Sequence, residues 1–220
     1  MSENLQRHLV LVLNNLILGV LTMAYPTVSA PYGLRPINLI GGQVFSGSTR
    51  QMFIASGEGT SIYYGDVVKL VAGGTIRKDV GTDAATPVGV FLGCSYTNPS
   101  TNQKIFAQYW PASTSASDAT AYVADDPDTL FKVAIVSGTT TITGKTIAVI
   151  GSNAVLVQNP GSTTTGDSAV AIIAPDATTS TFPIRIVDVV AETTNSSGSY
   201  TEVIVKWNQG MHMYLNPTGI

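Results

Sequence analysis

The sequence predicts an all-β (mainly β) fold, with a barrel-like or sandwich body that follows an extended N-terminal arm. Beyond Gln43, short apolar or alternating runs recur at roughly ten-residue intervals and are separated by Gly, Asn, Asp and Pro. Thr, Val and Ile, whose β-branched side chains favour pleated strands, are abundant. No long stretch of the body has the period of an amphipathic helix.

The first half of the body contains a predicted glycine hairpin. Residues 67–71 and 75–78 read as its two strands, because Gly73 and Gly74 supply the positive φ of a tight two-residue turn. Further strands are predicted at 87–92, 105–110, 119–124 and 131–136. The Asp-rich segment 125–128 is interpreted as a turn, because it lacks the Gly and the distal Glu of an EF-hand calcium loop.

The second half repeats this pattern. Strands are predicted at 146–150, 154–157, 169–174, 184–190 and 202–207. The polar segments 161–167 and 192–199 are expected to be exposed hairpin loops. The body, residues 44–220, accommodates either one domain or two lobes, 44–136 and 137–220.

Residues 1–23 form a separate apolar segment, whose core runs from 9 to 23 as LVLVLNNLILGVLTM. This run resembles a secretory signal, although Asn14 and Asn15 interrupt it. It is short for a bilayer anchor, which needs ~20 apolar residues. An upstream extension ahead of Met23 and a buried, packed helix are the other two interpretations, and the sequence leaves all three open.

Residues 24–43 are predicted to form an extended arm, because three prolines bias the residues before them towards extended geometry. The apolar side chains of this segment cannot be buried within it. The arm must therefore lie on its own body or on a neighbouring subunit, and the neighbour is favoured. The predicted interface residues are Tyr25, Tyr32, Leu34, Arg35 and Ile37.

Charged residues make up only 11% of the chain, against roughly 25% in typical soluble domains. Such a surface is either covered by partners or kept soluble by hydroxyl and amide groups. The formal net charge is −3, and Lys and Arg are scattered rather than clustered. Nucleic acid is therefore not an expected partner, since its phosphate backbone requires a basic footprint.

Candidate catalytic motifs are weak. Residues 138–146 resemble a phosphate-binding P-loop, but five residues rather than four separate Gly138 from Gly144, and a strand rather than a helix is predicted to follow. The only histidines are His8 and His212, and no G-x-S-x-G motif supplies a nucleophilic serine. We therefore predict that the chain is not an enzyme, with no cofactor, metal site or small-molecule substrate. A pair of carboxylates for glycoside hydrolysis stays possible in principle.

Cysteine and the aromatic residues have simpler interpretations. Cys94 is the only cysteine, which excludes an intrachain disulfide, and its apolar surroundings favour a small buried core residue over a nucleophile paired with His212. Tyr109, Trp110 and Trp207 could form a carbohydrate platform, but apolar strand patterns surround them. Packing in the core or at a subunit interface is favoured.

Several segments resemble structural proteins of tailed bacteriophages. Residues 65–70 (GDVVKL), 74–76 (GTI) and 85–93 (ATPVGVFLG) resemble a signature of capsid decoration (cement, or head-stabilising) proteins. Residues outside this stretch are similar to structural proteins of marine podophages and cyanophages, namely 30–36 (APYGLRP), 161–166 with 168–171, and 205–208 with 210–212. Residues 1–22 lie outside the resemblance.

The resemblance implies a β-tulip or barrel-like domain and a structural role in the virion. It implies a protein that binds the major capsid protein on the capsid surface, forms a homo-oligomer and stabilises the shell by adding buried area across subunit seams. The main alternative is a secreted or surface-attached β-module such as an adhesin. Another kind of virion protein and an unrecognised enzyme are the remaining alternatives.

Overall fold

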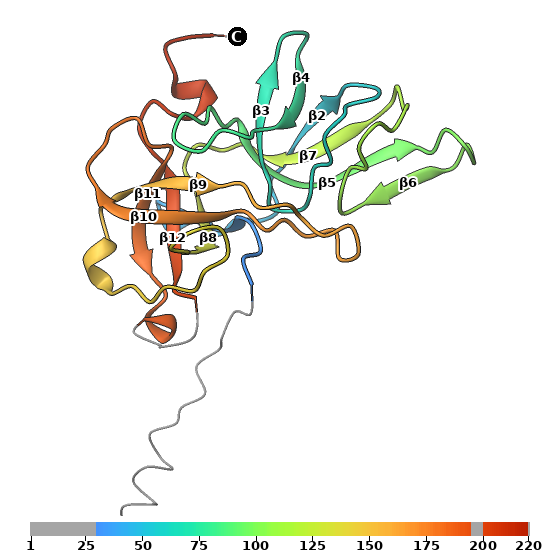
Figure 1. Cartoon of the computed structure of the whole chain (residues 1–220). Helices are drawn as coiled ribbons and strands as arrows, with labels where there is room; N and C mark the ends of the chain where they lie inside the picture. Colours follow the sequence, from blue (N-terminus) through green and yellow to red (C-terminus); the bar gives the residue numbers. More distant parts are fainter. Residues whose placement is uncertain (1–29, 195–199, 220) are drawn as a thin grey trace, which may run out of the picture.

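The computed structural model describes residues 30–194 and 200–219, and it is all-β, as predicted (Figure 1). The apolar segment 1–23 and Tyr25 lie outside the described residues. Within the described ranges, twelve strands form two six-stranded sheets. In Figure 1 the first sheet lies at upper right and the second at lower left.

The first sheet closes on itself. Its strands, in chain order, are β2 (Arg50–Ile54), β3 (Val67–Val71), β4 (Thr75–Lys78), β5 (Gly89–Thr97), β6 (Lys104–Ala107) and β7 (Thr120–Ala124). They are arranged β3-β4-β2-β7-β5-β6, and an additional pairing of β3 with β5 joins five of them into a closed barrel, to which β6 adds an outer edge. Alternate side chains such as Met52, Ile54 and Val123 fill the barrel core.

The second sheet is antiparallel throughout. It contains β1 (Arg35–Leu39), β8 (Thr129–Ala134), β9 (Asn153–Val157), β10 (Ala171–Ala177), β11 (Ile184–Val189) and β12 (Glu202–Trp207), arranged β1-β8-β12-β11-β9-β10. Ile135, just after β8, forms a bridge with Ile172 in β10, so this sheet also curls towards closure. Val67 and Val90 of the barrel belong to the same buried cluster as Leu34 and Phe131, and this shared core packs the two sheets together.

Most predicted strands are confirmed. The hairpin of β3 and β4 has the predicted boundaries, and its turn uses Gly73 at φ 96° and Gly74 at φ 75°. The strand predicted at 146–150 is wrong, because Ile147–Val149 forms a single 3-10 turn, η1. The Thr146 hydroxyl accepts a hydrogen bond from the backbone N–H of Ala148, and this cap stabilises the turn instead of a strand.

The loops differ from expectation in two places. The chain passes from the barrel to the second sheet between β7 and β8, through the predicted turn at 125–128, and not at 137. The sheets therefore do not follow a division into 44–136 and 137–220. Segment 161–167 is the loop between β9 and β10, as predicted. In the predicted exposed loop 192–199, Thr193 of the turn η2 (Ala191–Thr193) is only 1% exposed, and residues 195–199 lie outside the described residues.

Of the two locations that the sequence allowed for the arm, residues 30–39 lie on the chain's own body. Leu34 is fully buried in the core, and its backbone N–H donates to the Gly65 carbonyl at 2.9 Å. β1 pairs with β8 as an edge strand of the second sheet. The preference for a neighbouring subunit therefore fails for Leu34, because this side chain completes the core of its own fold.

Candidate functional site

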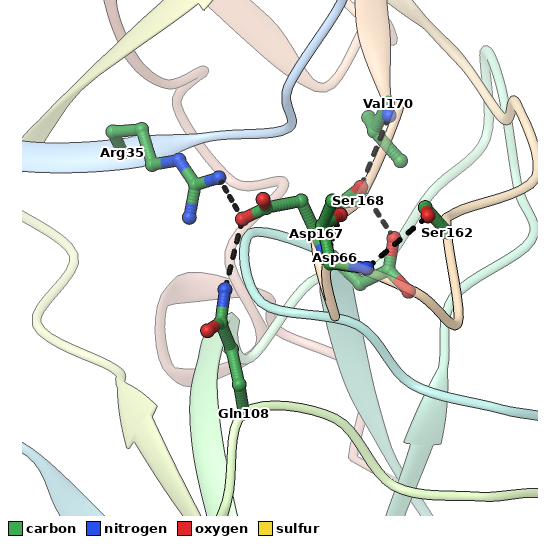
Figure 2. Close-up of polar contacts among 8 residues, drawn as sticks. Arg35, Asp66, Gln108, Ser162, Asp167, Ser168 and Val170 are labelled. Carbon is green, nitrogen blue, oxygen red and sulfur yellow. Dashed lines mark hydrogen bonds and ion pairs between the residues drawn. The ribbon is translucent and has the colours of Figure 1, made fainter.

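A group of polar side chains lies where the barrel meets the second sheet, and we call it the seam cluster (Figure 2). The chain contributes six residues to it from five separate points along its length. Figure 2 labels five of its members, Arg35 in β1, Asp66 just before β3, Gln108 just after β6, and Asp167 with Ser168 in the loop before β10. The sixth is Lys78 at the end of β4, which pairs with Asp66.

Asp66 occupies the buried half of the cluster and is fully inaccessible to solvent. Its Oδ1 lies 2.9 Å from the Lys78 ammonium and accepts a hydrogen bond from the Ser168 hydroxyl at 2.6 Å. Its Oδ2 accepts the backbone N–H of Tyr63 at 2.8 Å. A buried carboxylate costs free energy unless it is paired and hydrogen-bonded, and these three donors meet that requirement.

Asp167 occupies the outer half, and its side chain is 38% exposed. One oxygen, Oδ1, accepts from the Arg35 guanidinium at 2.6 Å and from the Gln108 amide at 2.9 Å (Figure 2). The guanidinium carbon of Arg35 also lies 4.1 Å from the centre of the Tyr64 ring, within cation–π range. Gln108 and Tyr64 come from the barrel side and Arg35 from the second sheet, so these contacts tie the two sheets together.

Two glycines allow the backbones to approach closely at the seam. Gly33 has φ 80°, and a Cβ there would lie 2.7 Å from the Gly65 carbonyl oxygen and 2.7 Å from the Ser168 Cβ. Gly65 has φ 93°, and a Cβ there would lie 3.2 Å from backbone atoms of Leu34 and Tyr32. Both positions therefore require glycine for conformation and for space.

A cleft of about 590 Å³ adjoins the seam cluster. Hydroxyl groups, one carboxylate and proline rings line it, contributed mainly by Pro31, Tyr32, Pro160, Ser162, Thr165 and Asp167. Ser168 also borders the cleft, but it is only 2% exposed, and its hydroxyl already donates to Asp66 and accepts from Val170. Ser168 therefore has the setting of a structural hydrogen-bond donor and not that of an accessible nucleophile.

The predicted interface residues lie in different surroundings in the structure. The Tyr32 hydroxyl donates to Glu202, and burial, with that hydrogen bond second, raises the pKa of Tyr32 well above its usual value. Arg35 belongs to the seam cluster, Leu34 to the core, and Ile37 is half-buried in β1. Tyr25 lies outside the described residues, and contact of Tyr32, Arg35 and Ile37 with another subunit stays a prediction.

The sequence did not reveal that four residues form hydrogen bonds or ion pairs in the seam cluster, namely Asp66, Lys78, Gln108 and Ser168. One signal was present, because Asp66 and Lys78 border the apolar strands of a hairpin, where a charge at an inward position indicates a buried pair. Their convergence with Gln108 and Ser168 depends on the arrangement of the two sheets. Hairpin periodicity alone could not reveal it.

The core interpretations of Cys94 and both tryptophans are confirmed. Cys94 is 1% exposed, and burial raises the pKa of its thiol to about 12, which suppresses the nucleophilic thiolate. Trp110 and Trp207 are 0% and 2% exposed, so their rings cannot form a surface platform. Tyr109 is half-buried and stacks on Tyr63, with 5.5 Å between ring centres.

His212 is fully buried beside Trp207 and Tyr214. Its Nδ1 accepts the backbone N–H of Tyr214 at 3.2 Å, and burial lowers the pKa of the imidazole. Within residues 30–194 and 200–219, no group of three or more His, Cys, Asp or Glu side chains could hold a metal ion. In the same ranges, no helix has the length and hydropathy needed to cross a bilayer.

The outer wall of the barrel carries a second feature, a row of residues in register across five strands. The row crosses β4, β2, β7, β5 and β6 in that order, and its residues are Thr75, Phe53, Thr120, Ser95 and Phe106, respectively. Phe53 is 66% exposed and Phe106 is 75% exposed. Tyr122 lies beside the row, and its hydroxyl donates to Ser95 at 3.3 Å. We call Phe53, Tyr122 and Phe106 the aromatic wall.

Comparisons with known protein families, curated proteins and solved structures found no match to this chain. The likeness to phage proteins therefore depends on the sequence segments quoted above. The physical case for a function depends on the seam cluster and the aromatic wall.

Proposed function

We propose that this protein is a structural virion protein that binds the outside of a tailed-phage capsid and stabilises the shell. The observation that carries the proposal is the aromatic wall, together with the resemblance of residues 65–93 to decoration proteins. Aromatic side chains are enriched in the cores of protein interfaces, and the wall leaves Phe53 and Phe106 exposed on the same side of the barrel as the half-buried Tyr122.

The aromatic wall has the composition expected of an interface. Between Phe53 and Phe106 the row contains only Thr120 and Ser95, and Ser95 is already 5% exposed and hydrogen-bonded to Tyr122. Covering this part of the row therefore removes little polar surface from water. The nearest charges on β6 are already paired, because Lys104 lies 2.8 Å from Asp118. Covering each phenylalanine would contribute about 1.5–3 kcal/mol, so two can decide whether a partner binds.

The rest of the fold suits a mechanical role. The seam cluster and the shared core fix the barrel against the second sheet, so a load on the barrel passes to the whole body. The proposed partner is the major capsid protein, and a homo-oligomer on the shell surface accords with the low charge of the chain. Stabilisation then follows from mass action, because the protein binds the assembled shell and not the dissociated subunits.

Co-sedimentation of the full chain with purified, expanded capsids tests the proposal. We expect saturable binding by the wild type and a loss of about tenfold or more in affinity for the F53S/F106S double variant. The I147S variant is the matched control, because Ile147 is 72% exposed but lies on η1 in the other half of the molecule. Absence of wild-type binding, or equal loss in the control, would contradict the proposal.

The alternative of a secreted β-module is favoured by the apolar run at 9–23, which lies outside the described residues. N-terminal sequencing of the mature protein separates the two proposals. A mature chain that begins near Ala30 indicates export, and one that retains residues 9–23 indicates that the run does not act as a cleaved signal.

A further inference from the structure

We propose that a cleft at the start of β11 and the end of β12 binds an oxyanion, a carboxylate or phosphate group, through Arg185 and Lys206. The cleft has a volume of about 330 Å³. Its polar lining comes from Arg185, Lys206, Asn208 and Gln209, and Pro127 and Leu215 form an apolar rim. This site is independent of the aromatic wall and of the proposed function.

The first observation is a pair of like charges on facing strands, of which only Lys206 has a carboxylate partner. Arg185 on β11 lies directly opposite Lys206 on β12 in the antiparallel register, so both side chains project from the same face. Like charges in this position destabilise a sheet unless an anion lies near them. Lys206 has only Asp128, at 3.3 Å, whose side chain is 64% exposed.

The second observation is the absence of a carboxylate beside Arg185. In the described part of the chain, every Lys and Arg except Lys145 and Arg185 has a carboxylate oxygen within 3.5 Å. The guanidinium instead donates to two neutral amide oxygens, those of Asn153 at 2.5 Å and Asn208 at 3.3 Å. Its positive charge is therefore not neutralised by the residues around it.

The third observation is that both amides are held in place. Asn153 is 2% exposed and its Nδ2 donates to the Thr179 carbonyl at 2.8 Å. Asn208 is 5% exposed, and its Nδ2 donates at 2.9 Å to each of the carbonyls of Ser180 and Phe182. These bonds aim both amide oxygens at Arg185, so the guanidinium is oriented before any ligand arrives.

An oriented guanidinium next to an ammonium group recognises planar or tetrahedral oxyanions. Arg offers five N–H donors in a fixed fork, and the amides of Asn153 and Asn208 use Nε and Nη2 but leave Nη1 for a ligand. Lys206 adds a point charge from the facing strand. The small volume and the apolar rim fit one oxyanion group on a compact body, such as an acidic side chain or a phosphate.

The test is a titration of the full-length protein, labelled with ¹⁵N, with inorganic phosphate and separately with acetate, at constant ionic strength set by chloride. We expect saturable shifts of the Arg185 Nε–H and Gln209 amide signals. R185Q should weaken binding about tenfold, because it removes a charge-assisted donor. K145Q is the matched control, since among the described residues Lys145 is the other cation without a carboxylate but lies away from the cleft, and it should leave binding unchanged.

The two titrations identify the ligand class, because a stronger response to phosphate or to acetate assigns the group. Linear shifts that do not saturate, or equal losses in R185Q and K145Q, would show only ionic screening and overturn the proposal. R185K covers the case in which R185Q does not fold, because it keeps the charge and removes the planar fork. Unweakened oxyanion binding by folded R185K would also overturn the assigned role of the guanidinium.

Discussion

Asp66 shows how a single residue links the two halves of this molecule. Its carboxylate is fully buried and accepts hydrogen bonds from Lys78 on the barrel and from Ser168 on the loop that leads into the second sheet. The apolar pattern of the surrounding strands predicts burial, but it does not predict the partners. These residues lie 12 and 102 positions away from Asp66, and only the folded topology brings them together.

Replacing Lys78 should leave this carboxylate buried without its cation. We expect K78M to lower the free energy of unfolding by about 3–5 kcal/mol, because removal of one partner of a buried pair leaves an uncompensated charge. Urea unfolding followed by circular dichroism measures the change. K104M is the control, since the Lys104–Asp118 pair is 45% and 42% exposed and its loss should change stability little. A loss of unfolding free energy for K78M as small as that for K104M would show that Asp66 needs no cation.

His212 should make stability depend on pH. Burial lowers the pKa of the folded imidazole below its usual value of 6.5. As the pH falls through about 6.5, the unfolded chain therefore binds a proton that the folded chain resists, and the free energy of unfolding falls. Denaturant unfolding between roughly pH 7.5 and 5.5 should show a steeper fall for the wild type than for H212Q. Parallel curves would exclude His212 as the source.

Among the elements, β5 depends most on a single glycine. A Cβ at Gly89 would lie 2.3 Å from the Ala124 carbonyl oxygen and 2.8 Å from Val123 Cγ1, so β7 leaves no space for a side chain. We expect G89A to lower the free energy of unfolding by about 1–3 kcal/mol through overpacking. Gly59 is the matched control, because a Cβ there meets nothing within 4 Å. Thermal unfolding of both variants tests this, and an unchanged melting temperature for G89A would contradict the close approach.

Strand positions were largely predictable from the sequence, because period-two patterns and glycine turns are local signals. The hairpin of β3 and β4 is confirmed with the predicted boundaries, since Gly73 and Gly74 determine where the chain reverses. The strand predicted over 146–150 failed because Ile147 looks like a strand residue, although it is 72% exposed and a threonine cap turns the chain there. Local hydropathy cannot distinguish an exposed isoleucine from a buried one.

At the scale of the whole molecule, the sequence predicted an all-β body but not how its strands divide between the two sheets. β1 comes from the predicted arm and joins a sheet whose other strands begin at Thr129, and this pairing across the chain has no local signal. The arm cannot be removed without removing Leu34 from the core. Deletion of residues 24–43 would therefore test folding as well as capsid binding, which makes point variants of the aromatic wall the cleaner experiment.

Under the proposed function, a partner surface would cover the aromatic wall of this weakly charged chain. Phe53 and Phe106 are separated by three strand spacings, about 14 Å along a flat sheet and less around a barrel, so one partner surface can contact both. The cleft at Arg185 lies on the second sheet and is free to act separately.

The most direct test of the proposed function is to image purified tailed-phage capsids mixed with this protein and to fit the two-sheet body into the density of the shell. We predict that the body lies on the outer surface of the capsid, with Phe53 and Phe106 facing the capsomers. Absence of the protein from the shell, or a bound orientation that leaves both phenylalanines exposed to solvent, would contradict the proposed function.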